Sequence, residues 1–354
     1  MLYVYQGEGF DLSVYFRRSA AFLLSVGIML ACQYAQPRTV WRALCTALPL
    51  WFGFALLRYA APSVYFSLVT PFVPTVVVSN ERGSSSLAPE ATDFGFTMVF
   101  LLAIAMVVRA RMAREGVSLP RWPLALAVLC AVASLSGTGI FGLALVAGIA
   151  LATARSRSGR GGRLGRFILL VVVGFAALFV LSTVAETGIR GVDLLAVAVT
   201  SPGELLNSTA SYRIAHNLVG LFGFFDSNFL GYGAGSFLVE GYQVYLRHDV
   251  GGLLGLAGYY AQNVPATLVQ SPVSFIAVIL LEYGLAGLLF LILVFTIPFR
   301  SAMPLATLAG SLMVIAWAQS FPAAWPLFWV MLGIAMSPRF RQSGTPRKSE
   351  KGRP

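Results

Sequence analysis

The stretch Val273-Ser-Phe-Ile-Ala-Val-Ile-Leu-Leu-Glu-Tyr-Gly-Leu-Ala-Gly-Leu-Leu-Phe-Leu-Ile-Leu-Val-Phe-Thr-Ile-Pro298 decides the fold class. It contains one charged side chain, Glu282, in 26 residues. A helix needs about 20 predominantly apolar residues to cross a bilayer. The apolar run is continuous rather than alternating, which favours a helix over a strand of a membrane barrel. We therefore predict a transmembrane helix over residues 273–298.

The rest of the chain has the same character. Of its 354 residues, 57% are apolar and only 11% are charged, and the mean hydropathy is +0.78. A soluble globular chain carries about 25% charged residues, and a disordered chain has low hydrophobicity. Within a bilayer each segment must satisfy its own backbone hydrogen bonds. The composition therefore predicts an all-α, polytopic membrane protein.

The apolar segments can be placed along the chain by their length. Residues 59–78 contain three prolines and are interpreted as an external or re-entrant segment. The predicted membrane domain covers residues 1–338 and includes one large external loop at 186–270, and residues 339–354 form a basic tail. We predict about nine spans: 19–36, 40–57, 94–108, 122–136, 139–154, 167–185, 273–298, 302–319 and 323–337.

The positions of the charges predict the orientation. The formal charge is +11, and nine of the 14 acids lie in segments 79–93 and 186–270. Short loops rich in Lys and Arg face the cytoplasm, so the C-terminus is expected to be cytoplasmic and 186–270 to be outside. The basic excess is then a topology signal, and nucleic acid is not an expected partner. Three segments hold 15 of the 25 basic residues: Arg109, Arg111, Arg114, Arg121; Arg155, Arg157, Arg160, Arg163, Arg166; Arg339, Arg341, Arg347, Lys348, Lys351 and Arg353.

The external loop of about 85 residues is unusually long. Loops longer than about 15 residues are usually functional or disordered. This one is not of low complexity, so we expect it to fold, with aromatic side chains that bury surface or stack on a ligand. The aromatic residues are Tyr212, Phe222, Phe224, Phe225, Phe229, Tyr232, Tyr242, Tyr245, Tyr259 and Tyr260.

Two external arginines are candidate anion-binding residues. Arg82 lies between two membrane segments, shortly before Glu90. A guanidinium offers a planar fork of donors that suits phosphate or carboxylate; the alternative, which position alone favours, is a snorkelling interfacial arginine. Arg213 and His216 are three residues apart and share a face if the segment is helical. An arginine there would hold a diphosphate while the histidine moves a proton, or the pair would be a solvated cation beside a structural histidine.

Three further features have more than one interpretation. Glu282 lies inside the 273–298 span. A charged side chain at the centre of a span raises the free energy of membrane insertion by roughly 2.5–3.5 kcal/mol. Glu282 would be a proton acceptor, a partner for a buried arginine, or a structural hydrogen-bonding group. The run Gly231–Gly235 is read as a turn rather than a phosphate cradle, because no strand precedes it. His248 is read as a solvated side chain rather than a second base. The three cysteines show no spacing typical of a metal site or a disulfide framework.

Several of these segments occur in an order that resembles a known family. The motifs, in order, are Arg82-Gly83 with Pro89-Glu90, then Ser134-Leu-Ser136, a basic turn, Tyr212-Arg213, Leu230-Gly-Tyr-Gly233 and Leu281-Glu-Tyr-Gly-Leu-Ala-Gly287. The chain resembles the Wzy-type O-antigen polymerases, within the O-antigen polymerase and ligase superfamily, over about residues 75–335.

The resemblance implies a function and a fold. The fold would be a polytopic helical glycosyltransferase of the GT-C type in the bacterial inner membrane. It would polymerise polyprenyl-diphosphate-linked oligosaccharide repeat units into O-antigen or exopolysaccharide at the periplasmic face, with no metal or other cofactor. Its partners would be an undecaprenyl-diphosphate-linked glycan donor and acceptor, membrane lipid and a chain-length regulator protein.

The resemblance also implies roles for single residues. Arg82 and Arg213 would hold the diphosphate, Glu282 would belong to the Glu-x-Gly helix start, and His216 or Glu90 would be the base. Ligases of the superfamily have His-Asn about nine residues before that glutamate, where this chain has Val273 and Ser274. The alternatives are such a ligase, transferring glycan to lipid A core or protein, and a secondary transporter, which would need ion-binding residues and repeats that the sequence lacks.

Overall fold

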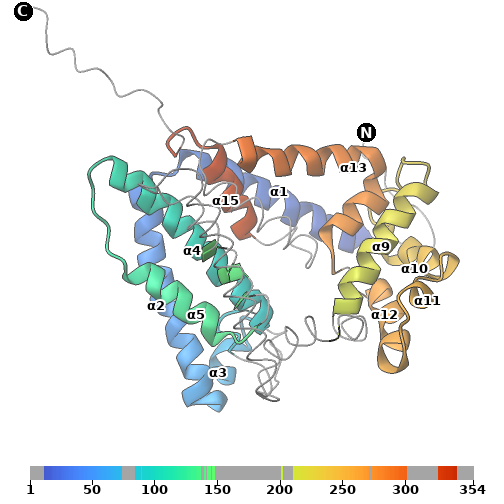
Figure 1. The fold of residues 1–354 in the computed structure, drawn as a ribbon, viewed down its shortest axis with the longest axis horizontal. Helices are drawn as coiled ribbons and strands as arrows, with labels where there is room; N and C mark the ends of the chain where they lie inside the picture. Colours follow the sequence, from blue (N-terminus) through green and yellow to red (C-terminus); the bar gives the residue numbers. More distant parts are fainter. Residues whose placement is uncertain are drawn as a thin grey trace, which may run out of the picture.

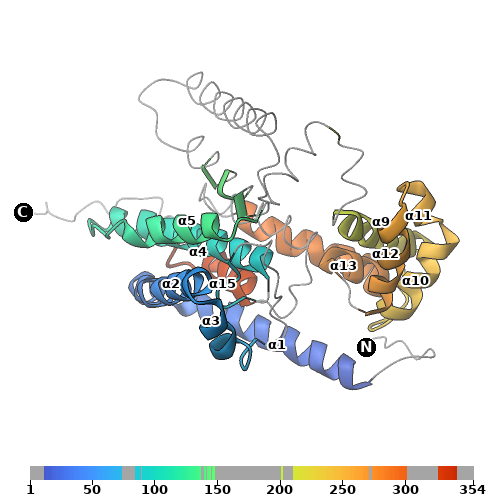
Figure 2. The ribbon, with the colours of Figure 1, turned by 90° about the horizontal axis from the view of Figure 1, so that it is seen from below.

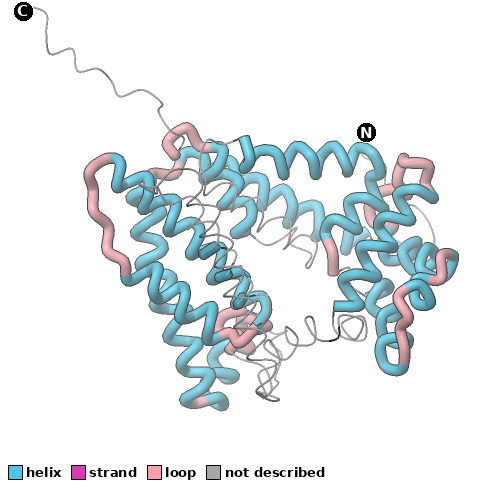
Figure 3. Tube along the Cα trace, in the orientation of Figure 1, coloured by secondary structure: helices cyan, strands magenta, loops and turns pink. Residues whose placement is uncertain are grey.

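The computed structural model describes residues 12–73, 84–88, 90–136, 139–140, 142–144, 146–147, 201, 210–270, 273–300 and 326–340. Within these ranges the regular elements are helices and no β-strand element occurs (Figure 3), which confirms the all-α prediction for this part of the chain. The helices are α1 (Leu12–Tyr34), α2 (Pro37–Ala60), α3 (Pro62–Val69), α4 (Ala91–Arg114), α5 (Trp122–Ala133), α9 (Ala210–Asp226), α10 (Phe237–Arg247), α11 (Val250–Leu253), α12 (Gly258–Gln270), α13 (Phe275–Arg300) and α15 (Pro326–Met336).

Among the described residues, three helices are long and apolar enough to cross a membrane: α2, α4 and residues Phe275–Thr296 of α13. Parts of α1, α5 and α15 are shorter apolar helices. These helices support membrane association. The predicted spans 167–185 and 302–319, and most of 139–154, lie outside the described residues, so the total of about nine spans, the GT-C likeness and the periplasmic position of the loop stay predictions.

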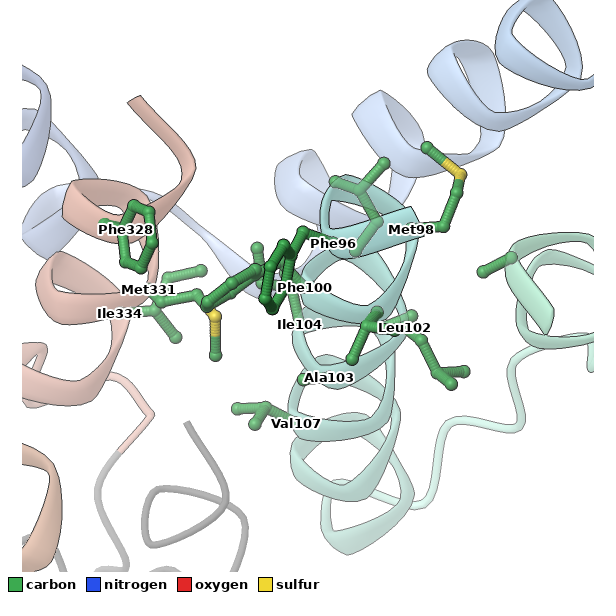
Figure 4. Close-up of a cluster of buried hydrophobic side chains, with 14 of the residues drawn as sticks. Phe96, Met98, Phe100, Leu102, Ala103, Ile104, Val107, Phe328, Met331 and Ile334 are labelled. Carbon is green, nitrogen blue, oxygen red and sulfur yellow. The ribbon is translucent and has the colours of Figure 1, made fainter. Parts of the chain in front are cut away.

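The centre of one half of the molecule is α4. Almost every side chain from Phe94 to Val108 is buried, so this helix is covered by protein on nearly all sides. Figure 4 shows Phe96, Phe100 and Ile104 of α4 on the side that faces α15. The rings of Phe100 and Phe328 pack with centroids 4.8 Å apart. Helices α2, α5 and α15 cover this central helix.

Residues 59–78, interpreted as external or re-entrant, contain the short helix α3. It has eight residues, too few to cross a bilayer. It begins with Pro62, whose fixed φ and missing N–H suit the first position of a helix. Its Tyr65 and Val69 are fully buried against α2 and the segment 84–88. The last residues of this range, 74–78, lie outside the described part of the chain.

The second half of the molecule is built by α9 to α12 and the first turns of α13. Figures 1 and 2 show this group at one end and α2 to α5 at the other, with α13 running between them. Its small core contains Ala215, Val219, Phe237, Val244, Val264, Leu268 and Leu281. The prediction that the long external loop folds is therefore confirmed for residues 210–270.

The span predicted over 273–298 is not one regular helix. Gly284 has φ 54° and ψ −131°, which breaks α13 into two helical parts. Leu285 N donates to Phe229 O (2.7 Å), and Gly233 N donates to Glu282 O (2.9 Å), so the turn after α9 binds the break directly. A Cβ on Gly284 would come within 2.5 Å of Gly231 N and closer still to Phe229 O. Glycine is required because both the φ angle and the space exclude a side chain.

Helices α1 and α15, which are far apart in the sequence, pack on each other. Gly333 packs so closely on α1 that an added Cβ would lie 2.7 Å from Cys32 Cβ. Ser337 Oγ donates to Gln33 O (2.7 Å), and the Arg339 guanidinium donates to Tyr34 O. Arg111 Nε donates to Arg339 O (2.8 Å). Two of the predicted basic segments therefore lie at the same end of the molecule, although their side relative to a membrane stays a prediction.

Candidate functional site

The starts of α4 and α9 bring charged residues together. Glu90 directly precedes α4 and Asp93 lies in its first turn. Arg213 lies in the first turn of α9. The Asp93 carboxylate is close enough to Glu90 and to Arg213 for both charges to act on it. Figure 1 shows both helices beginning at the lower side of the molecule, at the opposite end of α4 from the basic residues. Two acids and an arginine thus converge from distant parts of the sequence.

The backbone that carries Arg213 is tied to α13. Asn217 Nδ2 donates to Arg213 O (2.8 Å), and Ser274 Oγ donates to Asn217 Oδ1 (2.7 Å). Ser274 Oγ also accepts from Ala277 N (3.2 Å), so it satisfies a free donor at the start of α13. Arg213 itself is half-buried. This chain of hydrogen bonds fixes the first turn of α9 against the beginning of the apolar helix.

Aromatic side chains lie next to Arg213. Tyr212 packs edge-on against Tyr260 with ring centroids 5.7 Å apart, and its hydroxyl is hydrogen-bonded to Tyr259. Tyr259 is 66% exposed. The sequence predicted that aromatics of this loop would bury surface or stack on a ligand. Tyr245 and Phe237 are buried, whereas Tyr259 presents a ring that a ligand is able to reach.

Arg82 lies outside the described residues, but the segment that follows it is firmly held. Ser84, Ser85 and Ser86 are all buried. Ser85 Oγ is hydrogen-bonded to the Tyr65 hydroxyl (2.8 Å), which also donates to Ser86 O. Ser86 Oγ donates to Trp51 O (2.6 Å). Ser84 N is within bonding distance of both Ala133 O and the Tyr59 hydroxyl.

The Ser134-Leu-Ser136 motif packs on the first turns of α4. A Cβ added to Gly95 would lie 2.8 Å from Ser134 Oγ and closer to Ser136 Oγ. The two hydroxyls are 3.0 Å apart, and Ser134 Oγ donates to Ala131 O (2.7 Å). Leu135 adopts φ 48° between them. This tight turn therefore supports the helix start that carries Glu90 and Asp93.

His216 is a buried, bonded side chain. It has no exposed surface, and its ring stacks near Phe237. Nδ1 accepts from Val273 N (3.2 Å), and Nε2 lies 3.0 Å from Thr267 Oγ1. Because the Thr267 hydroxyl donates its proton to Val264 O (2.7 Å), it accepts from Nε2–H. Burial lowers the pKa of His216 to about 4. Both ring nitrogens are therefore in use within the fold, and this geometry favours the structural role.

Glu282 caps the start of α10. Its side chain is 5% exposed, and Oε1 accepts from Phe237 N (3.2 Å), the first backbone donor of that helix. An anion is favourable at a helix N-terminus. Among the roles that the sequence left open for Glu282, this contact supports that of a structural hydrogen bond to a neighbouring helix.

The run Gly231–Gly235 is a turn, as the sequence predicted, and its three glycines have positive φ.

His248 differs from its predicted solvated state. Its Nε2 lies 2.9 Å from Asp226 Oδ1, and the ring stacks on Phe222 with centroids 4.5 Å apart. Arg247 Nη1 contacts Asp226 Oδ2 at 2.7 Å. Asp226 ends α9 and Arg213 is in its first turn, so this cluster lies at the other end of the helix.

The charges of Glu90 and Arg213 thus both act on the Asp93 carboxylate, whereas His216 and Glu282 make buried hydrogen bonds within the fold. Sequence reasoning missed Asp93 as a functional residue, although its spacing of three from Glu90 places both carboxylates near one face of the helix start. No protein-family model matches the chain, and neither a curated protein nor a solved structure matches it. Any functional conclusion rests on these residues.

Proposed function

We propose that the chain is a membrane glycosyltransferase that polymerises polyprenyl-diphosphate-linked oligosaccharide units at the periplasmic face of the bacterial inner membrane. The observation that carries the proposal is that the charges of Arg213 and Glu90 both act on the Asp93 carboxylate in the first turn of an apolar helix. A lipid-linked diphosphate presents its charge where the hydrocarbon ends, and a guanidinium matches phosphate oxygens with a fork of donors.

The proposed reaction is a displacement at the anomeric carbon of the donor glycan. The acceptor's sugar hydroxyl oxygen forms a bond to that carbon, and the bond from carbon to the diphosphate oxygen breaks. The electron pair leaves with the diphosphate, where Arg213 and Arg82 stabilise the developing charge. One donor aimed at such a charge contributes about 10²–10³ in rate.

The hydroxyl proton needs an acceptor, and the carboxylates at the start of α4 are the candidates. Glu90 directly precedes α4 and Asp93 lies in its first turn, and a base must be within hydrogen-bond reach of the proton that it takes. His216 does not serve, because its ring nitrogens are occupied and buried. Tyr259, exposed beside Tyr212, offers a flat apolar ring on which a sugar face packs.

The decisive experiment is complementation of a deletion strain, with glycan lengths read from a ladder gel. Arg213→Ala should lower chain elongation at least about 100-fold and leave single-unit glycans. Arg213→Lys keeps the charge but loses the fork, so it should restore elongation only in part. Arg247→Ala is the matched control, because this arginine belongs to the same loop but pairs with Asp226 at the far end of α9.

Three outcomes separate the alternatives. Normal ladders in Arg213→Ala and Arg82→Ala, at normal protein levels, would refute the proposed roles. Accumulation of full-length, lipid-linked polymer in the deletion strain would identify a ligase instead. An unchanged ladder in the deletion strain would exclude both enzymes and leave a function of another class, such as transport.

A further inference from the structure

A small cavity lies at the opposite end of α4 from the proposed site. It has a volume of about 210 Å³ and is lined by Arg109, Ala113, Gly116, Val117, Ser118 and Leu119. The residues after α4 turn back at Gly116, which has φ 77°, and Val117 and Leu119 then pack on the main core. The cavity is open to the surface and lies between the last turns of the helix and the segment that follows it.

Arg109 is the charged group of this cavity. It is half-buried, and no hydrogen bond or ion pair joins it to another residue in the described part of the chain. Its neighbour Arg111 behaves differently, because it contacts Glu115 at 3.1 Å and donates to Arg339 O. A half-buried guanidinium that has five donors and no internal partner is suited to an external anion.

The charges around the cavity also favour an anion. Residues 109–121 contain four arginines and one acid, Glu115, which is already paired with Arg111. Arg114, in the last turn of α4, and Arg121, directly before α5, are exposed, and Arg339 is held next to Arg111. The one acid of the described segment 109–121 is thus paired, and its four arginines leave this segment with a net positive charge.

We propose that this cavity binds a phosphate group, with Arg109 as its principal ligand and the Ser118 hydroxyl available as a second donor. The volume lies below the roughly 300 Å³ of ordinary ligand pockets, which fits a headgroup better than a whole metabolite. The phosphate belongs either to an anionic lipid or to a small soluble molecule. Basic pockets at the ends of membrane helices commonly hold such headgroups. The inference is independent of the proposed glycosyltransferase reaction.

The test is native mass spectrometry of the full chain in detergent micelles doped with phosphatidylglycerol. The unsubstituted protein should retain a phosphatidylglycerol adduct, and Arg109→Gln should bind it about tenfold more weakly, equivalent to about 1.4 kcal/mol. Ala113→Leu fills the cavity without changing charge and should weaken binding as well. Arg114→Gln is the matched control, because it removes one charge from the same turn without lining the cavity, and it should change affinity less than about twofold.

A second arm distinguishes the two sources of phosphate. Inorganic phosphate that displaces the lipid adduct would show that the phosphate alone is recognised, whereas an adduct resistant to phosphate would assign the site to a lipid. Equal losses in Arg109→Gln and Arg114→Gln would indicate diffuse attraction and overturn the proposal. The absence of any adduct, together with no effect of inorganic phosphate on the thermal midpoint Tm, would overturn it too.

Discussion

The group of helices around α4 and the group around α9 are held together by different means. Around α4, stability comes from an apolar helix covered on nearly all sides, and the buried polar groups are mostly serine and threonine hydroxyls, with Arg58 of α2 as the charged exception. Around α9, charged and imidazole groups are buried, and each fastens one backbone segment to another. The comparison teaches that the first group depends on area removed from water, whereas the second depends on a few specific bonds.

The largest expected effect comes from breaking the contact between α13 and the turn after α9. Gly284→Val would place a branched side chain at φ 54° and against Phe229 O and Gly231 N. Backbone strain and overpacking each cost about 1–3 kcal/mol, so a total loss of about 3 kcal/mol or more is expected. The measurement is the yield of monodisperse protein by size-exclusion chromatography in detergent.

The matched control for this change lies in the other group. A Cβ on Gly53 of α2 would meet nothing within 4 Å, so Gly53→Ala should leave the yield unchanged or raise it. Equal yields of Gly284→Val and the unsubstituted protein would show that the break in α13 does not need glycine.

The second effect is a pH dependence that belongs to the α9 group. Burial lowers the pKa of His216 to about 4, below the value of about 6.5 in an unfolded chain. Between these values the unfolded chain binds a proton that the folded chain does not, so stability falls as the pH drops below 6.5. From pH 6.5 to 5 the loss is about 2 kcal/mol.

The measurement is Tm in detergent at pH 7.5, 6 and 5. His216→Gln should be less stable at pH 7.5 but should lose less on acidification than the unsubstituted protein. A slope of Tm with pH that is identical in both proteins would contradict the role of His216.

The smallest effect tests the hydroxyl contacts of the α4 group. Tyr65→Phe removes the hydroxyl that bonds Ser85 and Ser86 in a fully buried site. The expected cost is about 1–2 kcal/mol, measured as a lower Tm. Tyr59→Phe is the comparison: Tyr59 is 52% exposed, so water is able to replace the hydroxyl's bonds to Ala133 O and Ser84 N, and the cost should be smaller. A larger loss of Tm in Tyr59→Phe than in Tyr65→Phe would contradict the importance given to the buried Tyr65 hydroxyl.

The apolar helices were predictable because their signal is local. Spans predicted over 40–57 and 94–108 lie within α2 and α4, and the predicted folding of the external loop is confirmed by α9 to α12. The break at Gly284 was not predictable, because it depends on a turn more than 50 residues earlier that binds both sides of it. Apolar content does not reveal such a tertiary contact.

In the candidate site, too, local features were predictable from the sequence and tertiary contacts were not. Arg213 and Glu90 were identified from their chemistry and position, whereas the role of His216 depends on Val273 and Thr267, which only the fold brings to its ring. The sequence left three roles open for Glu282, because it does not show which group the carboxylate in this apolar helix bonds. In the structure one such group is Phe237 N.

The packing of α15 against α1 has a consequence for biosynthesis. About 290 residues separate Tyr34 from Pro326, so at 5–20 residues per second the ribosome needs on the order of 15–60 s to supply the partner of the first helix. During that interval the surface of α1 around Cys32 lacks its contact with Gly333. Helix α1 thus reaches its final packing only after translation has passed Met336.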